Sequence, residues 1–91
     1  MTMNYSLETT SRFDKQLKKL DRFEAITILK WLSKNIDGTS DPRKTGKALV
    51  GNHAGKWRYR IGNYRVIVRI DDNELIILAL EVGHRRGVYT K

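Results

Sequence analysis

A run of basic residues in the middle of the chain offers the side chains best suited to chemistry. Residues 43–69 contain eight lysines and arginines and no acidic residue, and they account for the whole net charge of +8. Arginine binds two phosphate oxygens at once and stays protonated at physiological pH. The run therefore predicts a surface for nucleic acid, an anionic membrane or an acidic protein, because a merely solvated surface usually mixes charges of both signs.

The spacing of these arginines predicts a β-hairpin that gathers them on one face. In residues 57–61, aromatic and aliphatic residues alternate with arginines, as in a half-buried strand. Gly62 and Asn63 fit a two-residue hairpin loop, which pairs Arg60 with Arg65. One face would then carry four arginines: Arg58, Arg60, Arg65 and Arg69. The other face would carry the apolar set: Trp57, Tyr59, Ile61, Tyr64, Val66, Val68 and Ile70. Like charges directly opposite each other destabilise a sheet, so a bound phosphate would remove that cost.

The segments before the hairpin predict one strand and two helices. Alternation at residues 3–7 predicts a short strand, and apolar residues at helical spacing predict helices at 10–20 and 21–38, with capping residues at their starts. Residues 39–56 are typical of a loop, with 48–50 expected to reach the core.

The last strand completes the predicted fold. Residues 75–82 are apolar on both faces, which is typical of a central strand. The order β-α-α-β-β-β predicts an α+β class, with a helical hairpin packed on a mostly antiparallel four-stranded sheet. Ninety-one residues make a single domain, 1–91.

An antiparallel last strand would return toward the hairpin turn and bring residues 83–86 beside Arg60 and Arg65. His84 and Tyr89 are then candidates for a general acid or base, and the residues leave the choice between them open. Plainer roles are a structural hydrogen bond for His84 and a hydrophobic latch for Tyr89.

Composition excludes several kinds of site. The chain has no cysteine and only two histidines, so we expect no metal, and it has no nucleotide-binding motif, so we expect no cofactor. It has no apolar run long enough to span a membrane and no signal-peptide pattern at its start, so we expect a soluble cytoplasmic protein with no membrane partner. Metal-free phosphoryl transfer remains open, because RNA supplies its own 2′-OH as nucleophile.

Three segments of the chain resemble the RelE toxins of bacterial and archaeal type II toxin-antitoxin modules. These are residues 49–52, 55–67 and 82–89, and the predicted first strand and helices also fit, so the resemblance covers nearly the whole chain. The combined pattern is typical of the RelE/ParE superfamily. Members of the RelE branch are ribosome-dependent endoribonucleases that cut mRNA in the ribosomal A site by 2′-OH attack, without metal. The resemblance therefore implies that this chain is an mRNA endoribonuclease.

The resemblance also implies roles for single residues. Arg58 and Arg60 match basic residues of the family's active surface, and Arg65 matches its phosphate-stabilising arginine. Arg85 matches a second catalytic arginine, and Tyr89 matches the C-terminal tyrosine proposed as general base and stacking residue. We expect a further set to bind RNA around this site: Lys47, Lys56, Arg69, His84 and Arg86.

The implied partners are the ribosome, the mRNA in its A site and a RelB-like antitoxin. An acidic, partly disordered antitoxin would be attracted by the same basic surface, and residues 75–82 and the outer helix faces could anchor it. Two other functions stay open. One is inhibition of DNA gyrase, because ParE toxins share the fold, and the other is a non-catalytic RNA-binding or ribosome-binding module.

Overall fold

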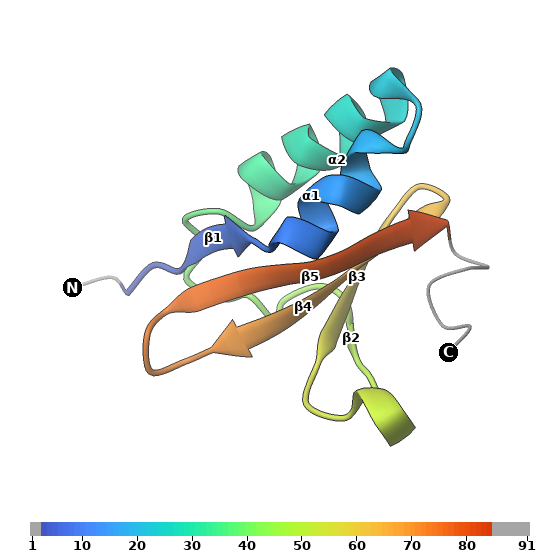
Figure 1. Cartoon of the computed structure of the whole chain (residues 1–91). Coiled ribbons are helices and arrows are strands. Elements are labelled where there is room, and N and C mark those ends of the chain that lie inside the picture. Colours follow the sequence, from blue (N-terminus) through green and yellow to red (C-terminus); the bar gives the residue numbers. More distant parts are fainter. Residues whose placement is uncertain (1–2, 85–91) are drawn as a thin grey trace.

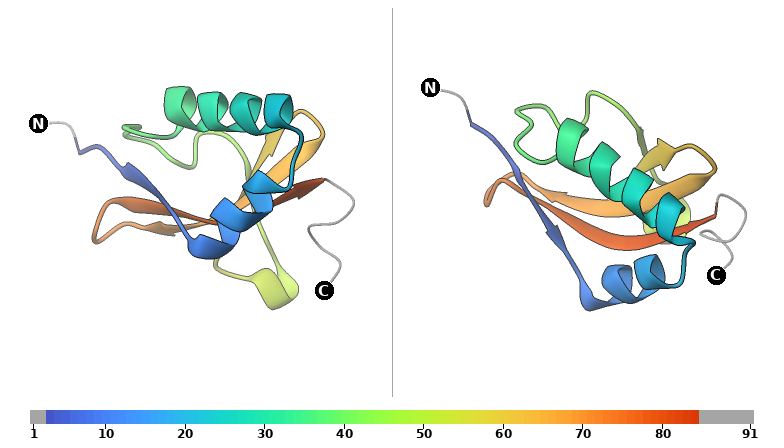
Figure 2. Two further views of the ribbon diagram at one scale, coloured as in Figure 1. Left: turned by 45° about the horizontal axis from the view of Figure 1, so that its top comes forward. Right: turned by 90° about the horizontal axis from the view of Figure 1, so that it is seen from above.

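Two helices pack on one face of a five-stranded sheet in residues 3–84, the part of the chain that the computed structural model describes (Figure 1). The helices are α1 (Ser11–Lys18) and α2 (Arg22–Asn35). The strands are β1 (Ser6–Thr9), β2 (Lys47–Ala48), β3 (Trp57–Ile61), β4 (Tyr64–Asp71) and β5 (Ile76–His84), and a 3₁₀ turn, η1 (Gly51–His53), follows β2. Figure 2 shows α2 lying over the strands.

The sheet order is β1-β5-β4-β3-β2, with β1 parallel to β5 and every other pair antiparallel. The predicted α+β class, the mostly antiparallel sheet and the central position of the last strand are confirmed. The predicted number of four strands is wrong, because β2 adds a fifth. Its two residues are too few to show an alternating pattern, so only its pairing with β3 reveals it.

Capping residues set where both helices begin, as predicted. The Thr10 hydroxyl accepts a hydrogen bond from the backbone N–H of Phe13 at 3.1 Å and donates to the carbonyl of Ala79 at 3.0 Å, which ties the start of α1 to β5. The Asp21 carboxylate accepts from the N–H of Phe23 at 3.1 Å at the start of α2. Both helices end a few residues earlier than predicted.

The core lies between the helices and the apolar face of the hairpin. Tyr59, Ile61, Val66 and Val68 of the predicted apolar set are buried there, and the other three members of the set are partly buried against them. They pack with residues of both helices: Phe13, Leu17, Ile28, Leu32 and Ile36. The Tyr59 hydroxyl donates to the carbonyl of Pro42, and burial raises the pKa of this phenol to about 12. Tyr59 is therefore a neutral core residue.

The expectation that residues 48–50 reach the core is wrong. Val50 is 83% exposed and Ala48 is also exposed. The reason is the place of β2 at the outer edge of the sheet, where it pairs only with the first two residues of β3 (Figure 1).

In the described residues, neither helix has the length and hydrophobicity needed to cross a bilayer.

Candidate functional site

Four arginines of the hairpin occupy the sheet face opposite the helices, and we call this surface the arginine face: Arg58, Arg60, Arg65 and Arg69. The observed register pairs Ile61 with Tyr64 across the loop and Arg60 with Arg65 next to it, as predicted. Because Ile61 and Tyr59 point into the core, the arginines that alternate with them point away from it.

Arg60 and Arg65 form the closest pair of like charges that this register creates. The two-residue loop makes theirs a pair without mutual backbone hydrogen bonds, for which the Cα atoms lie about 4.5 Å apart. Within residues 3–84, neither Arg58 nor Arg60 has a carboxylate at ion-pair distance. Two arginines that face each other across a hairpin can bind an anion between their guanidinium groups.

A buried layer supports the arginine face from within. Ile67 lies on this face between Arg65 and Arg69 and opposite Arg58, yet it is 0% exposed. Helices do not cover this side, so the aliphatic stems of neighbouring side chains must shield it. The Nε of Arg58 is also buried, and no hydrogen-bond acceptor meets it within the described part of the chain. The Arg58 side chain thus lies against the sheet, and its Nε–H can still donate a hydrogen bond to a ligand.

A hollow of about 310 Å³ adjoins the arginine face at the edge of β3 that β2 partly covers. Its lining combines three cations with an indole ring and two small residues: Trp31, Thr45, Gly46, Lys47, Arg58 and Arg60. Lys47 pairs directly with Arg58, so β2 extends the basic surface. Sequence reasoning assigned no role to Trp31, because only packing brings α2 beside this edge, where the Trp31 ring lies 5.8 Å from that of Tyr59.

Arg69 and Lys56 lie at the far end of the arginine face. Arg69 is four residues along β4 from Arg65, which is about 13 Å. Both line a hollow of about 280 Å³ with Glu81, whose carboxylate forms an ion pair with Arg12 at 3.5 Å. The predicted RNA-binding residues at this end are therefore separated from the central arginines and stand beside an acidic group.

His84 is brought to the end of the hairpin but not onto the arginine face. It pairs with Tyr64, and the two rings meet edge to face with centroids 5.6 Å apart. Cross-strand partners share a face, so Gly83, the partner of Arg65, occupies the arginine side instead. β5 therefore brings residues 83 and 84 to the hairpin turn as expected, but the side chain of His84 does not join the arginines, because alternation along β5 turns it to the other face.

Three predicted site residues follow β5: Arg85, Arg86 and Tyr89. They lie outside the described residues, so their roles stay predictions. β5 ends beside the hairpin turn, since its last residue, His84, pairs with the first residue of β4.

Arg43 belongs to the basic run but is engaged elsewhere. Its guanidinium donates two hydrogen bonds to the Asp72 carboxylate, at 3.0 and 3.1 Å, and the Tyr5 hydroxyl donates to the same carboxylate at 2.6 Å. The bonds from Arg43 and then from Tyr5 lower the pKa of Asp72, and the bond to Asp72 raises the pKa of Tyr5. Arg43 is thus part of a structural cluster at the β4–β5 turn.

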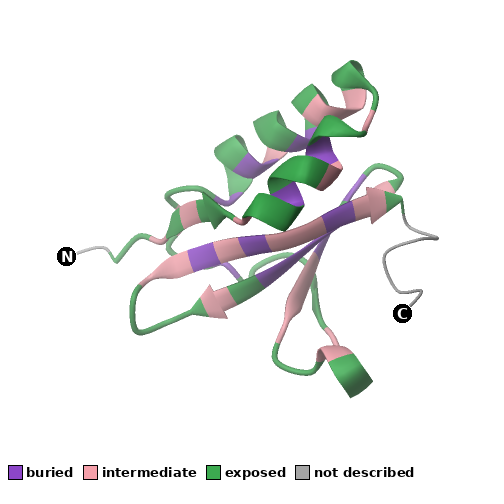
Figure 3. Cartoon of the chain, viewed as in Figure 1, coloured by how far each residue is buried: buried purple, intermediate pink, exposed green. Residues whose placement is uncertain are grey.

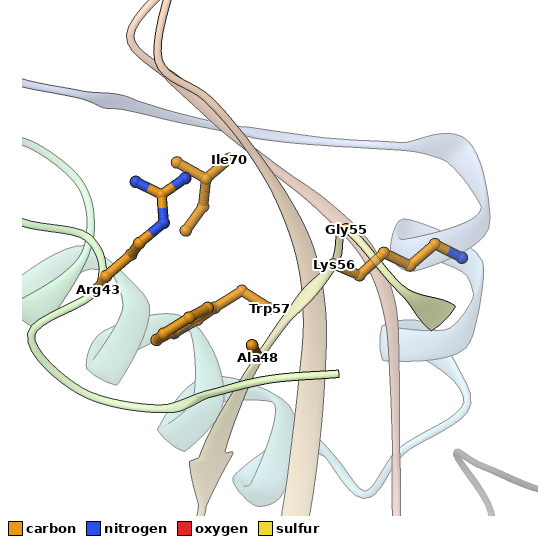
Figure 4. Close-up of a pocket in the computed structure, with 6 residues that line it drawn as sticks. All are labelled: Arg43, Ala48, Gly55, Lys56, Trp57 and Ile70. Atoms are coloured by element: carbon orange, nitrogen blue, oxygen red, sulfur yellow. The ribbon is translucent and has the colours of Figure 1, made fainter. Parts of the chain in front are cut away.

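The hollow beside this cluster offers little chemistry. It measures about 210 Å³ and is lined by Trp57, Ile70 and Ala48 together with Arg43, Gly55 and Lys56. Figure 4 shows the ammonium group of Lys56 pointing away from it.

Within residues 3–84, no group of three or more histidine and acidic side chains is placed to hold a metal ion.

Comparisons with known proteins agree over nearly the whole chain. The family model for the ParE toxin of type II toxin-antitoxin systems, parDE, matches residues 7–89. Toxin RelG of Mycobacterium tuberculosis is 28% identical over 89 residues, which cover 98% of this chain and 100% of that protein.

Solved structures show the same fold. The toxin-antitoxin complex RelBE2 of Mycobacterium tuberculosis matches with a TM-score of 0.83 and 27% identity, over 93% of this chain and 95% of that one. A mutant of the E. coli toxin RelE in the free state matches with a TM-score of 0.73 and 20% identity, over 94% and 88%. The toxin of the archaeal RelE-RelB complex from Pyrococcus horikoshii matches with a TM-score of 0.64 and 21% identity, over 94% and 100%.

Proposed function

Because the chain belongs to the ParE toxin family of type II toxin-antitoxin systems, within the RelE/ParE superfamily, we propose that it is a toxin that cuts mRNA in the ribosomal A site. The observation that carries this proposal is the pair of Arg60 and Arg65 on the sheet face opposite the helices, with Arg58 held against the sheet beside it. Such a surface suits phosphoryl transfer without a metal, in which RNA supplies the nucleophile.

In the proposed reaction, the 2′-oxygen of a nucleotide attacks the adjacent phosphorus and the bond to the 5′-oxygen breaks. Arg60 and Arg65 bind the phosphate from two sides and stabilise the additional negative charge of the phosphorane. Tyr89 takes the proton from the 2′-OH, Arg85 adds positive charge, and the departing 5′-oxygen takes a proton from solvent, which leaves a 2′,3′-cyclic phosphate on the other product. These two residues follow β5 in the sequence, and β5 itself ends beside the hairpin turn.

The hollow at the edge of β3 binds the nucleotide next to the cleaved phosphate. Lys47 and Arg58 provide cations for its phosphate, and the half-buried indole of Trp31 provides an aromatic wall for its base. Arg69 and Lys56 attract RNA from a greater distance, because they stand at the far end of the arginine face.

We propose a RelB-like antitoxin as the protein partner. Toxins of similar fold from Mycobacterium tuberculosis and Pyrococcus horikoshii were solved in complexes with such antitoxins. Action on the translating ribosome would place the protein in the cytoplasm.

The second candidate function is inhibition of DNA gyrase, because the matching family model describes ParE toxins. An inhibitor that works by protein binding has no need for two opposed arginines beside an aromatic hollow. The arginine face therefore favours the ribonuclease.

The test compares the wild type with Arg65→Ala, Tyr89→Phe and Arg43→Ala in cells, with mRNA ends mapped by primer extension. We expect codon-linked cuts in the wild type that fall about 100-fold or more in Arg65→Ala. Arg43→Ala removes the same charge from the Asp72 cluster, so its cuts should persist. Equal cutting by Arg65→Ala and Arg43→Ala would refute the assigned site.

Two other outcomes would replace the proposed activity. If the wild type produces no cuts but blocks supercoiling by purified gyrase, the second candidate is correct. If it binds ribosomes without cutting, and Tyr89→Phe is equally toxic, the chain is a binding module.

A further inference from the structure

A β-bulge in β5 places a carboxylate on the basic side of the sheet. Glu81 pairs with Ile67, whereas the next residue of β4 pairs with Ala79. Leu80 is therefore left without a partner, as the extra residue of a bulge. Strict alternation from the buried Ala79 would turn Glu81 into the core, but the bulge shifts the next buried position to Val82, and Figure 3 shows the wider gap. Glu81 thus shares the arginine face with Ile67.

Three cations from separate segments surround this carboxylate. Arg12 of α1, Lys56 before β3 and Arg69 of β4 line the hollow of about 280 Å³ together with it. The β3–β4 register, continued by one residue, puts Lys56 opposite Arg69. Arg12 forms the ion pair with Glu81 at 3.5 Å. No carboxylate within residues 3–84 lies at ion-pair distance from Lys56 or Arg69, so these two cations can bind an anionic ligand.

The lining of this hollow combines the kinds of group that contact a nucleotide. Lys56 and Arg69 provide cations for a phosphate, and the half-buried Leu80 provides an apolar surface for a sugar or a base. The Glu81 carboxylate can accept a hydrogen bond from an N–H or O–H group. An acidic peptide would bring carboxylates against Glu81, which repels them. A nucleotide offers both an anion and hydrogen-bond donors, so it fits the mixed charges of this hollow better.

We propose that this hollow is a second nucleotide subsite for the substrate RNA. Beyond attracting RNA from a distance, Lys56 and Arg69 bind one phosphate of the strand, and Glu81 accepts a hydrogen bond from the ribose 2′-OH or the base of that nucleotide. The inference rests on the proposed function for RNA as the ligand, but not on cleavage. Arg69 lies about 13 Å from Arg65, and a stacked strand advances about 3.4 Å per nucleotide. The subsite therefore holds a nucleotide about four positions or fewer from the cleaved phosphate.

The length of the RNA separates a subsite from general attraction. A dinucleotide bound at Arg60 and Arg65 cannot reach this hollow, whereas an RNA of about six nucleotides can. We expect Arg69→Gln to weaken binding of the longer RNA by about 10-fold and to leave dinucleotide binding within about twofold. The matched control is Arg22→Gln, which removes the same charge from an exposed position of α2 and should lower neither affinity. Nuclear magnetic resonance titrations of the purified toxin measure both affinities and show that each variant is folded.

Glu81→Gln tests the hydrogen bond, because it keeps the shape of the side chain and removes the carboxylate. Its matched control is Glu74→Gln in the exposed β4–β5 turn. The ligands are six-nucleotide RNAs in which one 2′-OH at a time is removed, or one base at a time is replaced, so that the two scans distinguish a ribose donor from a base donor. We expect one change outside the cleaved nucleotide to weaken wild-type and Glu74→Gln binding by about 3- to 10-fold, and the same change to have no effect in Glu81→Gln.

Three results would overturn the inference. The first is a wild type that binds the longer RNA no more tightly than the dinucleotide. The second is an Arg69→Gln variant that loses the same affinity for both lengths, which would leave only long-range attraction. The third is a Glu81→Gln variant with the same two scans as the wild type. A wild type that passes these binding tests but cuts no mRNA in cells would refute only the ribonuclease proposal, and one that cuts mRNA but fails them would refute only the subsite.

Discussion

Replacing one arginine of the opposed pair should make the protein more stable and less active. In Arg60→Gln, the positive charge opposite Arg65 is removed, while the β3–β4 register and the exposed position of the side chain stay the same. Like charges at directly opposed positions of a sheet destabilise it, so their removal stabilises the fold. The same change removes a proposed phosphate ligand, so the proposed RNA cleavage should become slower.

The size of the gain follows from the distance and the surroundings of the charges. Two unit charges about 5 Å apart repel by about 0.8 kcal/mol in water, and the exposed side chain of Arg60 can move its charge further from the half-buried Arg65. We therefore expect the free energy of unfolding to rise by about 0.5 kcal/mol. For a domain of this size, such a gain raises Tm by roughly 2 to 4 °C.

Urea unfolding at two salt concentrations provides the measurement. At about 10 mM salt the repulsion acts almost unscreened, whereas at about 1 M the screening length falls to about 3 Å. The stability gain of Arg60→Gln should therefore be clear at low salt and vanish at high salt. Arg12→Gln is the matched control, because it removes a positive charge that forms an ion pair with Glu81 and should bring no gain.

A loss of stability in Arg60→Gln at low salt would refute this reasoning. So would a gain of the same size at both salt concentrations, because repulsion between exposed charges must be screened. Either result would mean that contacts other than charge repulsion determine how Arg60 affects the free energy of unfolding.

Three further predictions concern the framework of the site. Tyr59→Phe should lower the free energy of unfolding by roughly 1 to 2 kcal/mol in urea titrations, because a buried carbonyl loses its donor; an unchanged midpoint would contradict this. Asp72→Asn should be less stable than the wild type at neutral pH, because the bonds from Arg43 and Tyr5 lower the pKa of Asp72 in the folded protein; the difference should begin to shrink below the ordinary aspartate pKa of about 3.9 and vanish only below the lowered pKa, and equal stabilities at neutral pH would contradict this. Gly46→Ala should cost about 1 to 3 kcal/mol in thermal unfolding and loosen β2, because Gly46 has a φ of +91° and its added Cβ would collide with the carbonyl of Arg58; wild-type stability would contradict this.

Local patterns in the sequence were sufficient to predict the backbone frame of the site. Alternation of arginines with aromatic and aliphatic residues predicted β3, and a two-residue loop then allowed only one pairing, with Arg60 opposite Arg65. The sequence predicted the helix starts from Thr10 or Ser11 and from Asp21, because a capping side chain bonds to a backbone group only a few residues away; Thr10 is the residue that caps α1. These features depend on neighbours in sequence, so periodicity and spacing report them.

Contacts between distant segments decided which charged and aromatic groups serve the site. Arg43 and Asp72 are 29 positions apart, and only the folded chain shows that this arginine of the basic run is already bound. Trp31 reaches the arginines because α2 crosses beside the edge of β3, and His84 turns away because its register against β4 sets its face. Periodicity describes one element at a time, whereas these positions depend on how separate elements pack against one another.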